Sequence, residues 1–149
     1  MPLEPQDHFR ESYLLLTTAA RLVQRHFDDA LAPLGLTRAA VIALKAMSGR
    51  PTNQEQLAAV VRVQSQTLGR VLSRLETGGL VTRTRDPQDR RQFQVEITDA
   101  GEAALKAARE AESAALPSDF DEWEILREQL SRFINSFPSP RPARDSTRS

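Results

Sequence analysis

The chain of 149 residues contains no cysteine, and its only histidines are His8 and His26. Without cysteine it can form no disulfide bond, thiolate metal site, cysteine nucleophile or thiol redox switch. The two histidines lie far apart in the sequence with no cluster of other ligands nearby, so we expect neither a metal site nor a cofactor. No Ser/His/Asp arrangement, glycine-rich phosphate loop or motif for a paired-carboxylate site is visible, and we therefore expect that the protein is not an enzyme.

The sequence also lacks any apolar run near the ~20 residues that a membrane-spanning helix needs. Its first residues, MPLEPQDHFRES, do not have the basic and then apolar layout of a signal peptide, so we expect a cytoplasmic protein with no membrane partner. A composition that is 40% apolar and 27% charged suits one globular domain, which we place at residues 1–137. Residues 138–149 have no core-forming side chain beyond one alanine and are predicted to be a disordered tail.

The net charge of zero hides an uneven distribution along the chain. Residues 62–92 carry seven arginines and three acidic residues, a net charge of +4. Residues 1–33 and residues 99–137 have net charges of −2 and −5. A basic middle between acidic ends is the kind of asymmetry that bears on the choice of partner.

The spacing of apolar residues predicts a mainly helical protein. The apolar residues of one predicted helix, Leu68, Val71, Leu72 and Leu75, form a buried stripe, so Arg70 and Arg74 point the opposite way. The first three expected helices are 7–32, a second that starts at the N-cap Thr37 and ends at 48–49, and 53–61, which follows a capping box of Thr52 and Glu55. The last three are about 65–77, 98–115 with Thr98 as its cap, and a sixth whose apolar stripe runs from Phe120 to Phe137.

Between the fourth and fifth helices the apolar period changes from 3.6 to 2. Residues 80–85 and 93–97 read as two strands joined by the turn Asp86-Pro87-Gln88-Asp89, which predicts one two-stranded hairpin. The expected fold is therefore mainly α with a small β-wing. Residues 34–98 would form a winged helix-turn-helix lobe, flanked by dimerisation helices at 7–32 and 99–137.

The second helix of a helix-turn-helix enters the major groove of double-stranded DNA, and its N-terminal residues reach the base edges. Glutamine pairs with adenine and arginine with guanine because their paired donors and acceptors match those edges. Arg74 and Arg38 are expected at phosphates, Arg90 or Arg91 in a minor groove, and Asp86 and Asp89 as residues that shape the wing. The full set of expected DNA contacts is Ser65, Gln66, Thr67, Arg70, Arg74, Arg83, Arg85, Arg90, Arg91 and Arg38, with Arg83 and Arg85 alternatively pairing with Asp86 or Asp89.

These residues carry a resemblance to the MarR-type winged helix-turn-helix regulators. It covers LGLTRAAVIALKAM at 34–47 and the stretch from QEQLAAVV at 54 to DAGEAAL at 105. The most specific part is GLVTRTRDPQDRR at 79–91, followed by Thr98 and Gly101. The resemblance implies a homodimer that represses, or less often activates, nearby genes. It also implies that DNA is released when a small, often aromatic, acid or an antibiotic binds.

The sequence departs from the family pattern at two places. Ser73 stands where the family often has an acidic residue that pairs with a wing arginine, which puts this bracing of the wing in doubt. Gly69 lies inside the predicted recognition helix, where glycine costs about 1 kcal/mol relative to alanine. It either permits close approach to DNA or has no role.

The terminal helices are expected to form the twofold interface of a homodimer. The last helix carries many large apolar groups and has little of its own chain to pack against. The family places its effector pocket between the dimerisation helices and the DNA-binding lobe, which makes His26 a candidate ligand residue beside the alternative of an ordinary surface histidine. The expected interface residues are Phe9, Leu16, Phe120, Trp123, Leu130, Phe133 and Phe137.

Two functions are compatible with these features. The first is a sequence-specific DNA-binding transcriptional regulator, a ligand-responsive homodimeric repressor on a palindromic operator. The alternative is a winged-helix module that binds proteins and has no specific operator. Salt-sensitive binding to a palindromic duplex distinguishes the first from the second.

Overall fold

The computed structural model describes residues 4–61 and 65–138, without the side chains of Ser65 and Gln66. The predicted tail therefore lies, apart from its first residue, outside the described residues. The chain forms two compact units, Met1–Leu116 and Pro117–Ser149. The prediction of a single domain over residues 1–137 stays a prediction.

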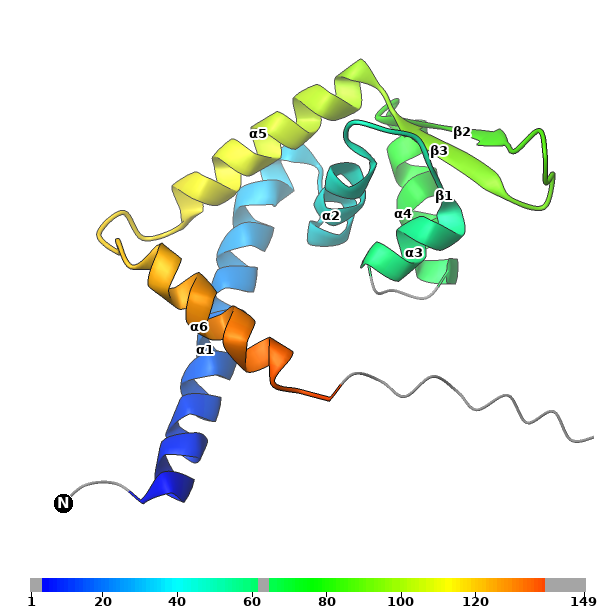
Figure 1. Cartoon of the computed structure of the whole chain (residues 1–149). Helices are drawn as coiled ribbons and strands as arrows, with labels where there is room; N and C mark the ends of the chain where they lie inside the picture. Colours follow the sequence, from blue (N-terminus) through cyan, green and yellow to red (C-terminus); the bar gives the residue numbers. More distant parts are fainter. Residues whose placement is uncertain (1–3, 62–64, 139–149) are drawn as a thin grey trace, which may run out of the picture. The chain divides into compact units, whose positions relative to one another are not determined.

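The first unit is mainly helical, with a small sheet (Figure 1). This confirms the expected fold class of a winged helix-turn-helix. Its elements are α1 (Pro5–Leu31), the 3-10 turn η1 (Ala32–Leu34), α2 (Arg38–Met47), β1 (Thr52–Asn53), α3 (Gln54–Val61), α4 (Ser65–Thr77), β2 (Val81–Arg85), β3 (Phe93–Ile97) and α5 (Asp99–Ala115).

Local sequence signals set most of the helix ends. The side chains of Thr37 and Thr98 accept hydrogen bonds from the amides of Ala40 and Gly101, so both predicted N-caps are confirmed. The chain leaves α4 through Gly79, whose φ of 75° lies in the left-handed region that glycine adopts without a steric penalty. The bounds predicted for the fourth helix agree with those of α4.

The predicted hairpin is confirmed as the antiparallel pair of β2 and β3, but the sheet has a third strand that was not predicted, in the order β1-β3-β2. Thr52 of β1 pairs with Val95 of β3 in an antiparallel register. Thr52 does not cap α3 as predicted, because its hydroxyl donates a hydrogen bond of 3.3 Å to Gln56 Oε1 instead of accepting one from a helix amide. Asn53 does so, with its Oδ1 accepting a hydrogen bond of 2.7 Å from the amide of Gln56.

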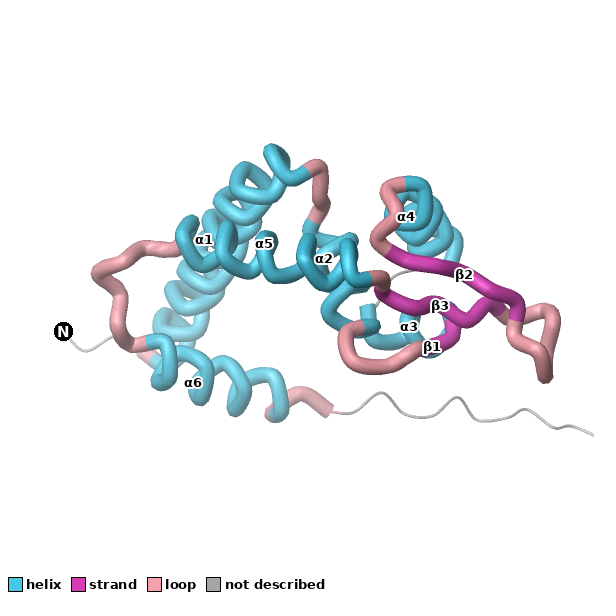
Figure 2. Tube along the Cα trace, turned by 90° about the horizontal axis from the view of Figure 1, so that it is seen from above, coloured by secondary structure: helices cyan, strands magenta, loops and turns pink. Residues whose placement is uncertain are grey.

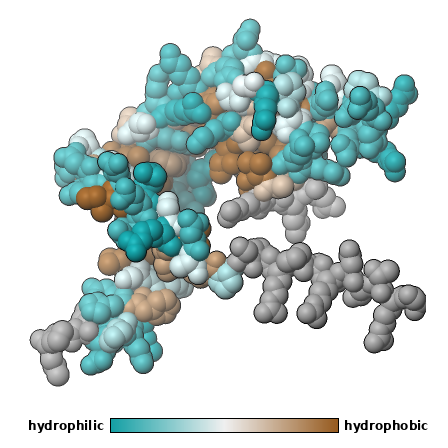
Figure 3. All heavy atoms as spheres, in the orientation of Figure 1, coloured by the Kyte–Doolittle hydropathy of each residue, from teal (hydrophilic) through white to brown (hydrophobic). Residues whose placement is uncertain are grey.

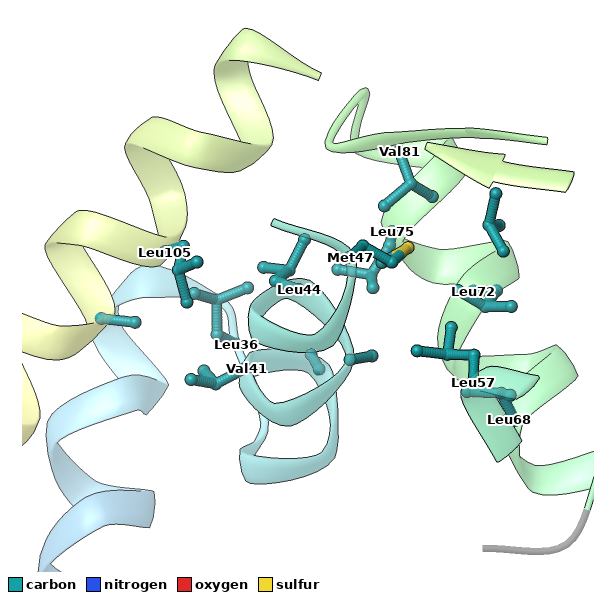
Figure 4. Packing of buried hydrophobic residues seen from close by; sticks show 14 of the residues in the cluster. Leu36, Val41, Leu44, Met47, Leu57, Leu68, Leu72, Leu75, Val81 and Leu105 are labelled. Carbon is teal, nitrogen blue, oxygen red and sulfur yellow. The ribbon is translucent and has the colours of Figure 1, made fainter. Parts of the chain in front are cut away.

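The core joins the helices to the sheet from both sides of α2. Figure 4 shows Leu36, Val41 and Leu44 facing Leu105 of α5, while Met47 faces α4 and Val81. Each fully buried leucine contributes about 1.5–3 kcal/mol relative to an exposed one. This core fixes which face of α4 is turned inward. The buried residues are Leu31, Leu36, Ala40, Val41, Ala43, Leu44, Met47, Leu57, Leu68, Leu72, Leu75, Val81, Val95, Leu105 and Ala108.

The two long helices of the first unit run side by side, as Figure 2 shows for α1 and α5. The N-terminal part of α1 extends beyond this contact and exposes large apolar side chains, among them Phe9 with 66% of its surface exposed. Figure 3 shows this part of the surface as a mixture of hydrophobic and hydrophilic groups, whereas the end of the wing is hydrophilic.

The second unit contains α6 (Trp123–Asn135), which begins after an edge-to-face contact between Phe120 and Trp123 with ring centroids 4.7 Å apart. Phe133 and Phe137 make a similar contact at 5.2 Å near the end of the helix. Phe120 and Leu130 are half-buried, and Trp123, Ile125, Leu126, Phe133, Ile134 and Phe137 are exposed.

Among the described helices, no single one is long and apolar enough to cross a membrane. By length and composition alone, the bent pair Pro5–Leu34 and Arg38–Met47 would pass the same test together, with an angle of 78° between its two parts.

Candidate nucleic-acid interface

Helix α4 has a buried face and an exposed face, as the spacing of its leucines predicts. Leu68 and Leu72 are completely buried. The opposite side, which we call the outer face of α4, exposes Thr67, Arg70, Ser73, Arg74 and Thr77. The expected contacts Ser65 and Gln66 begin the same helix, but their side chains lie outside the described residues.

Arg70 and Arg74 carry unpaired positive charges on this face. Among the residues that the structure describes, neither guanidinium has a carboxylate within 4 Å, whereas those of Arg38, Arg83 and Arg91 do. An open concavity of about 680 Å³, lined by Gly69, Arg70, Ser73, Arg74 and Arg83, lies on the same side. We call it the α4–wing groove. The guanidiniums of Arg70 and Arg74 at this concavity favour the binding of an anionic polymer.

Arg83 of β2 connects the wing to α4. Its Nη2 donates hydrogen bonds to Ser73 Oγ at 3.2 Å and to Glu76 Oε1 at 3.3 Å. Its guanidinium also lies 5.5 Å from the centre of the Phe93 ring, within the range of a cation–π contact. The alternative that Arg83 pairs with Asp86 or Asp89 was wrong, because β2 directs Arg83 toward the helix and away from the turn.

This contact changes the interpretation of Ser73. The serine at that position removes the acidic residue that often pairs with a wing arginine in the family, yet Arg83 still reaches a carboxylate. Glu76, one helical turn further along α4, supplies it. Sequence reasoning missed Glu76, although its position three residues after Ser73 places both on one side of the helix.

The turn of the wing is stabilised by its own polar groups. Asp86 Oδ1 accepts a hydrogen bond of 2.9 Å from the amide of Gln88, and Asp89 Oδ1 accepts one of 3.1 Å from the amide of Arg91. Arg85 Nη1 donates a 2.5 Å bond to the carbonyl oxygen of Arg90, and its guanidinium lies 4.9 Å from the Phe93 ring centre. Asp86, Asp89 and Arg85 therefore use their side chains to stabilise the backbone of the turn.

The arginines at the tip of the wing remain accessible to a partner. Arg90 is exposed, and the Arg91 side chain is 94% exposed although its Nε lies 3.5 Å from Asp89 Oδ1. Arg38 lies elsewhere, at the start of α2, where its Nε is 2.7 Å from Asp28 Oδ1. A phosphate contact by Arg38 would therefore compete with an ion pair to α1.

A second pocket lies on the inner flank of α4 and has a volume of about 540 Å³. We call it the flank pocket. Arg70 and Arg74 line this pocket as well as the α4–wing groove. The start of α2 at Thr37 also faces it, with the positive end of the helix dipole. Its other lining residues are Leu34, Gly35, Leu36, Ala40, Thr67, Val71, Leu75, Gly78, Leu80 and Ala104.

The expected ligand residue His26 is exposed on α1. A shallow pocket of about 380 Å³ lies one turn earlier on that helix and is lined by Thr18, Arg21, Leu22 and Arg25. The structure therefore brings Thr67, Arg70, Arg74 and Arg83 together around α4, and places Arg85, Arg90 and Arg91 on the wing. It leaves Arg38 and His26 apart from both groups.

Known proteins share this arrangement. The model of the MarR family matches residues 34–92. The HTH-type transcriptional regulator SarZ of Staphylococcus epidermidis is 29% identical over 121 residues, which cover 80% of this chain and 79% of the relative.

Solved structures extend the similarity to most of the chain. The transcriptional regulator BldR from Sulfolobus solfataricus is 28% identical, with a TM-score of 0.78 and coverage of 91% of this chain and 100% of BldR. Reduced AbfR bound to DNA is 28% identical, with a TM-score of 0.68 and coverage of 89% and 97%. Together with the winged helix-turn-helix fold and the basic outer face of α4, these matches support a MarR-type winged-helix regulator, a type of DNA-binding transcriptional regulator and not of enzyme.

Proposed function

We propose that the protein is a sequence-specific regulator that binds a palindromic operator as a homodimer and represses transcription until a small acid binds to it. The single observation that carries the DNA-binding part is the pair of guanidiniums of Arg70 and Arg74, on the outer face of α4 beside the wing, which have no carboxylate partner among the described residues. A cationic helix face with a basic hairpin next to it fits the major groove together with an adjacent minor groove.

The proposed contacts follow from position along the helix. Residues near the start of a recognition helix reach base edges, so Thr67 and Arg70 are assigned to bases, together with Ser65 and Gln66. Arg74 lies one turn further on and is assigned to a phosphate. Arg90 and Arg91 at the wing tip are assigned to the minor groove, whose negative potential attracts arginine.

The homodimer is proposed from the exposed apolar side chains of α1 and α6. Phe9 is 66% exposed and Phe133 is 45% exposed, and both belong to larger sets of exposed apolar groups. Apolar surfaces of this kind mark interaction sites. A twofold axis would repeat α4 on successive major grooves, about one helical turn of DNA apart, which is why the operator is expected to be palindromic.

Regulation by a small acid is proposed from the flank pocket. Its volume of about 540 Å³ lies within the range of small-molecule sites, and its apolar walls with two arginines suit an apolar body that carries a carboxylate. An acid bound there uses Arg70 and Arg74, so it competes with DNA for the same charges. DNA and acid then exclude each other, and the acid relieves repression.

The test is binding of the purified protein to the intergenic duplex upstream of its own gene, measured by fluorescence anisotropy over a salt series. We expect affinity at least about 10³-fold above that for a scrambled duplex, with a steep dependence on salt. Equal, weak binding to both duplexes would contradict the proposal for this operator and would favour the protein-interaction module. For the regulatory part, 2-naphthoate should weaken DNA binding and the neutral 2-naphthamide should not.

A further inference from the structure

We infer that Glu76 and Arg83 are a pair of positioning residues that hold the wing at a fixed angle to the recognition helix, and that Arg83 is not itself a DNA contact. This inference rests on the proposed function, because it concerns how the outer face of α4 and the wing reach DNA together. It gives Glu76, an acidic residue on the DNA-reading helix, a favourable role in binding a polyanion.

Arg83 contacts three side chains that belong to two elements. Its Nη2 is shared between Ser73 Oγ at 3.2 Å and Glu76 Oε1 at 3.3 Å, both on α4. The Phe93 ring of β3 lies beside the guanidinium at 5.5 Å. Ser73 is itself oriented, since its hydroxyl donates a 2.9 Å hydrogen bond to the carbonyl oxygen of Gly69.

The sheet register explains why Arg83 faces the helix. Arg83 lies directly opposite Val95, and residues that pair across strands share one face of the sheet. Val95 is completely buried, so this is the face that packs on the core. The Arg83 side chain is accordingly only 19% exposed, against 94% for Arg91 at the wing tip.

Such burial and pairing leave Arg83 poorly suited to bind phosphate. Its charge is compensated by Glu76, and its Nε is buried without a hydrogen-bond partner among the described residues. To contact DNA, Arg83 would have to leave Glu76, Ser73 and Phe93. These three contacts are instead those of a side chain that holds the wing against α4.

The decisive experiment compares two acidic residues of the same lobe, both changed to methionine. Methionine keeps an unbranched side chain but removes the charge and the strong acceptor. Glu96 of β3 is the matched control, because it is exposed and no hydrogen bond or ion pair of its side chain is found in the described part of the chain. Operator affinity of Glu96→Met should stay equal or rise, since a repulsive charge is lost. Operator affinity of Glu76→Met should fall, by about threefold to tenfold.

Whether Glu76→Met raises or lowers operator affinity distinguishes an Arg83 that contacts DNA from an Arg83 that only positions the wing. If Arg83 is a direct contact, Glu76→Met strengthens binding because the acid beside the contact is lost, whereas Arg83→Met weakens it. If the two residues form one brace, Arg83→Met and the double variant bind equally weakly. Moving the acid to the neighbouring turn, with Ser73→Asp added to Glu76→Met, should restore the affinity to within about twofold of wild type, because Ser73 already lies within reach of Arg83.

Amide hydrogen exchange in the free protein provides a readout that needs no DNA. Exchange of β2 and β3 should accelerate in Glu76→Met and Arg83→Met and remain as in wild type in Glu96→Met. Unchanged exchange in all three variants, or tighter DNA binding by Glu76→Met, overturns the inference. A wild-type protein without any preferred duplex overturns the proposed function instead, while the exchange result still decides whether the pair holds the wing.

Discussion

Thr98 is bound to Gly79 across the junction between the wing and α5. The Thr98 hydroxyl donates a hydrogen bond of 2.7 Å to the carbonyl oxygen of Gly79 and accepts one of 3.1 Å from the amide of Gly101. The Thr98 amide donates to the carbonyl oxygen of Leu80 at 3.0 Å. One residue thus caps α5 and connects it to the segment that leaves the recognition helix, so the orientation of α5 is coupled to that of α4.

Replacing Thr98 with valine tests this coupling, because valine keeps the shape and lacks the hydroxyl. The change removes a helix cap and leaves the Gly79 carbonyl oxygen without its partner. We expect a loss of about 1–2 kcal/mol in the free energy of unfolding, measured by urea denaturation. Thr98→Ser retains the hydroxyl and should lose clearly less. Equal losses in the two variants would mean that the methyl group, and not the hydrogen bonds, stabilises the junction.

Gly101 lies against the backbone at the same junction. A Cβ at this position would collide with the carbonyl oxygen of Leu80 and with the side chain of Ile97. Gly101→Ala should therefore lower the free energy of unfolding by about 1–3 kcal/mol, despite the better helix propensity of alanine. Thermal unfolding followed by circular dichroism measures the effect. A variant as stable as wild type would show that α5 shifts at little cost.

Gly69 provides the opposite case within α4. A Cβ there would meet only the Nε2 atom of Gln54 at 3.6 Å, an ordinary contact distance. Gly69→Ala should therefore stabilise the protein by about 0.5–1 kcal/mol, since alanine is the better helix former. Operator affinity measured in parallel decides between the two explanations of this glycine. A stabler protein with weaker operator binding would show that DNA approaches the helix closely at Gly69, and unchanged affinity would show that the glycine has no role.

The sequence predicted α4 well because every signal that defines it is local. Leu68, Leu72 and Leu75 mark its buried face, and Gly78 and Gly79 end it. Arg70 and Arg74 are exposed for the same reason, since a helix that buries one stripe exposes the other.

The features that sequence reasoning missed depend on contacts between distant residues. Two residues, Thr52 and Asn53, show no alternation that could identify β1, and they become a strand only because β3 lies beside them. The partner of Arg83 was missed similarly. Glu76 and Arg83 meet only when the wing folds back on α4. The acids nearer in sequence, Asp86 and Asp89, suggested a local ion pair, but their carboxylates accept hydrogen bonds from backbone amides of the turn.

The two arginines on the outer face of α4, Arg70 and Arg74, should differ in what they contribute to DNA binding. Arg70→Ala should cost about 1–3 kcal/mol on the operator and relax the preference at one base pair, because the arginine is assigned to a base edge. Arg74→Ala should weaken binding to all duplexes alike and reduce the salt slope by about one, as expected for a phosphate contact. Anisotropy titrations against single-base operator variants over a salt series measure both effects. Arg109→Ala on the exposed surface of α5 serves as the control and should change neither.

The proposed dimer can be tested on the apolar face of α6. Phe133 is 45% exposed in the single chain, and burial of the part still exposed would contribute about 1 kcal/mol per subunit, roughly half of the value for a whole phenylalanine side chain. Light scattering during size-exclusion chromatography should give twice the mass of the chain for wild type. Phe133→Glu should shift this equilibrium toward the single chain and weaken operator binding, because two half-sites are then read by separate molecules. Glu128→Gln, a change on the same helix at an exposed acidic residue, is the control and should remain dimeric. A Phe133→Glu protein that stays fully dimeric would remove α6 from the proposed interface and leave the exposed residues of α1 as the remaining candidates.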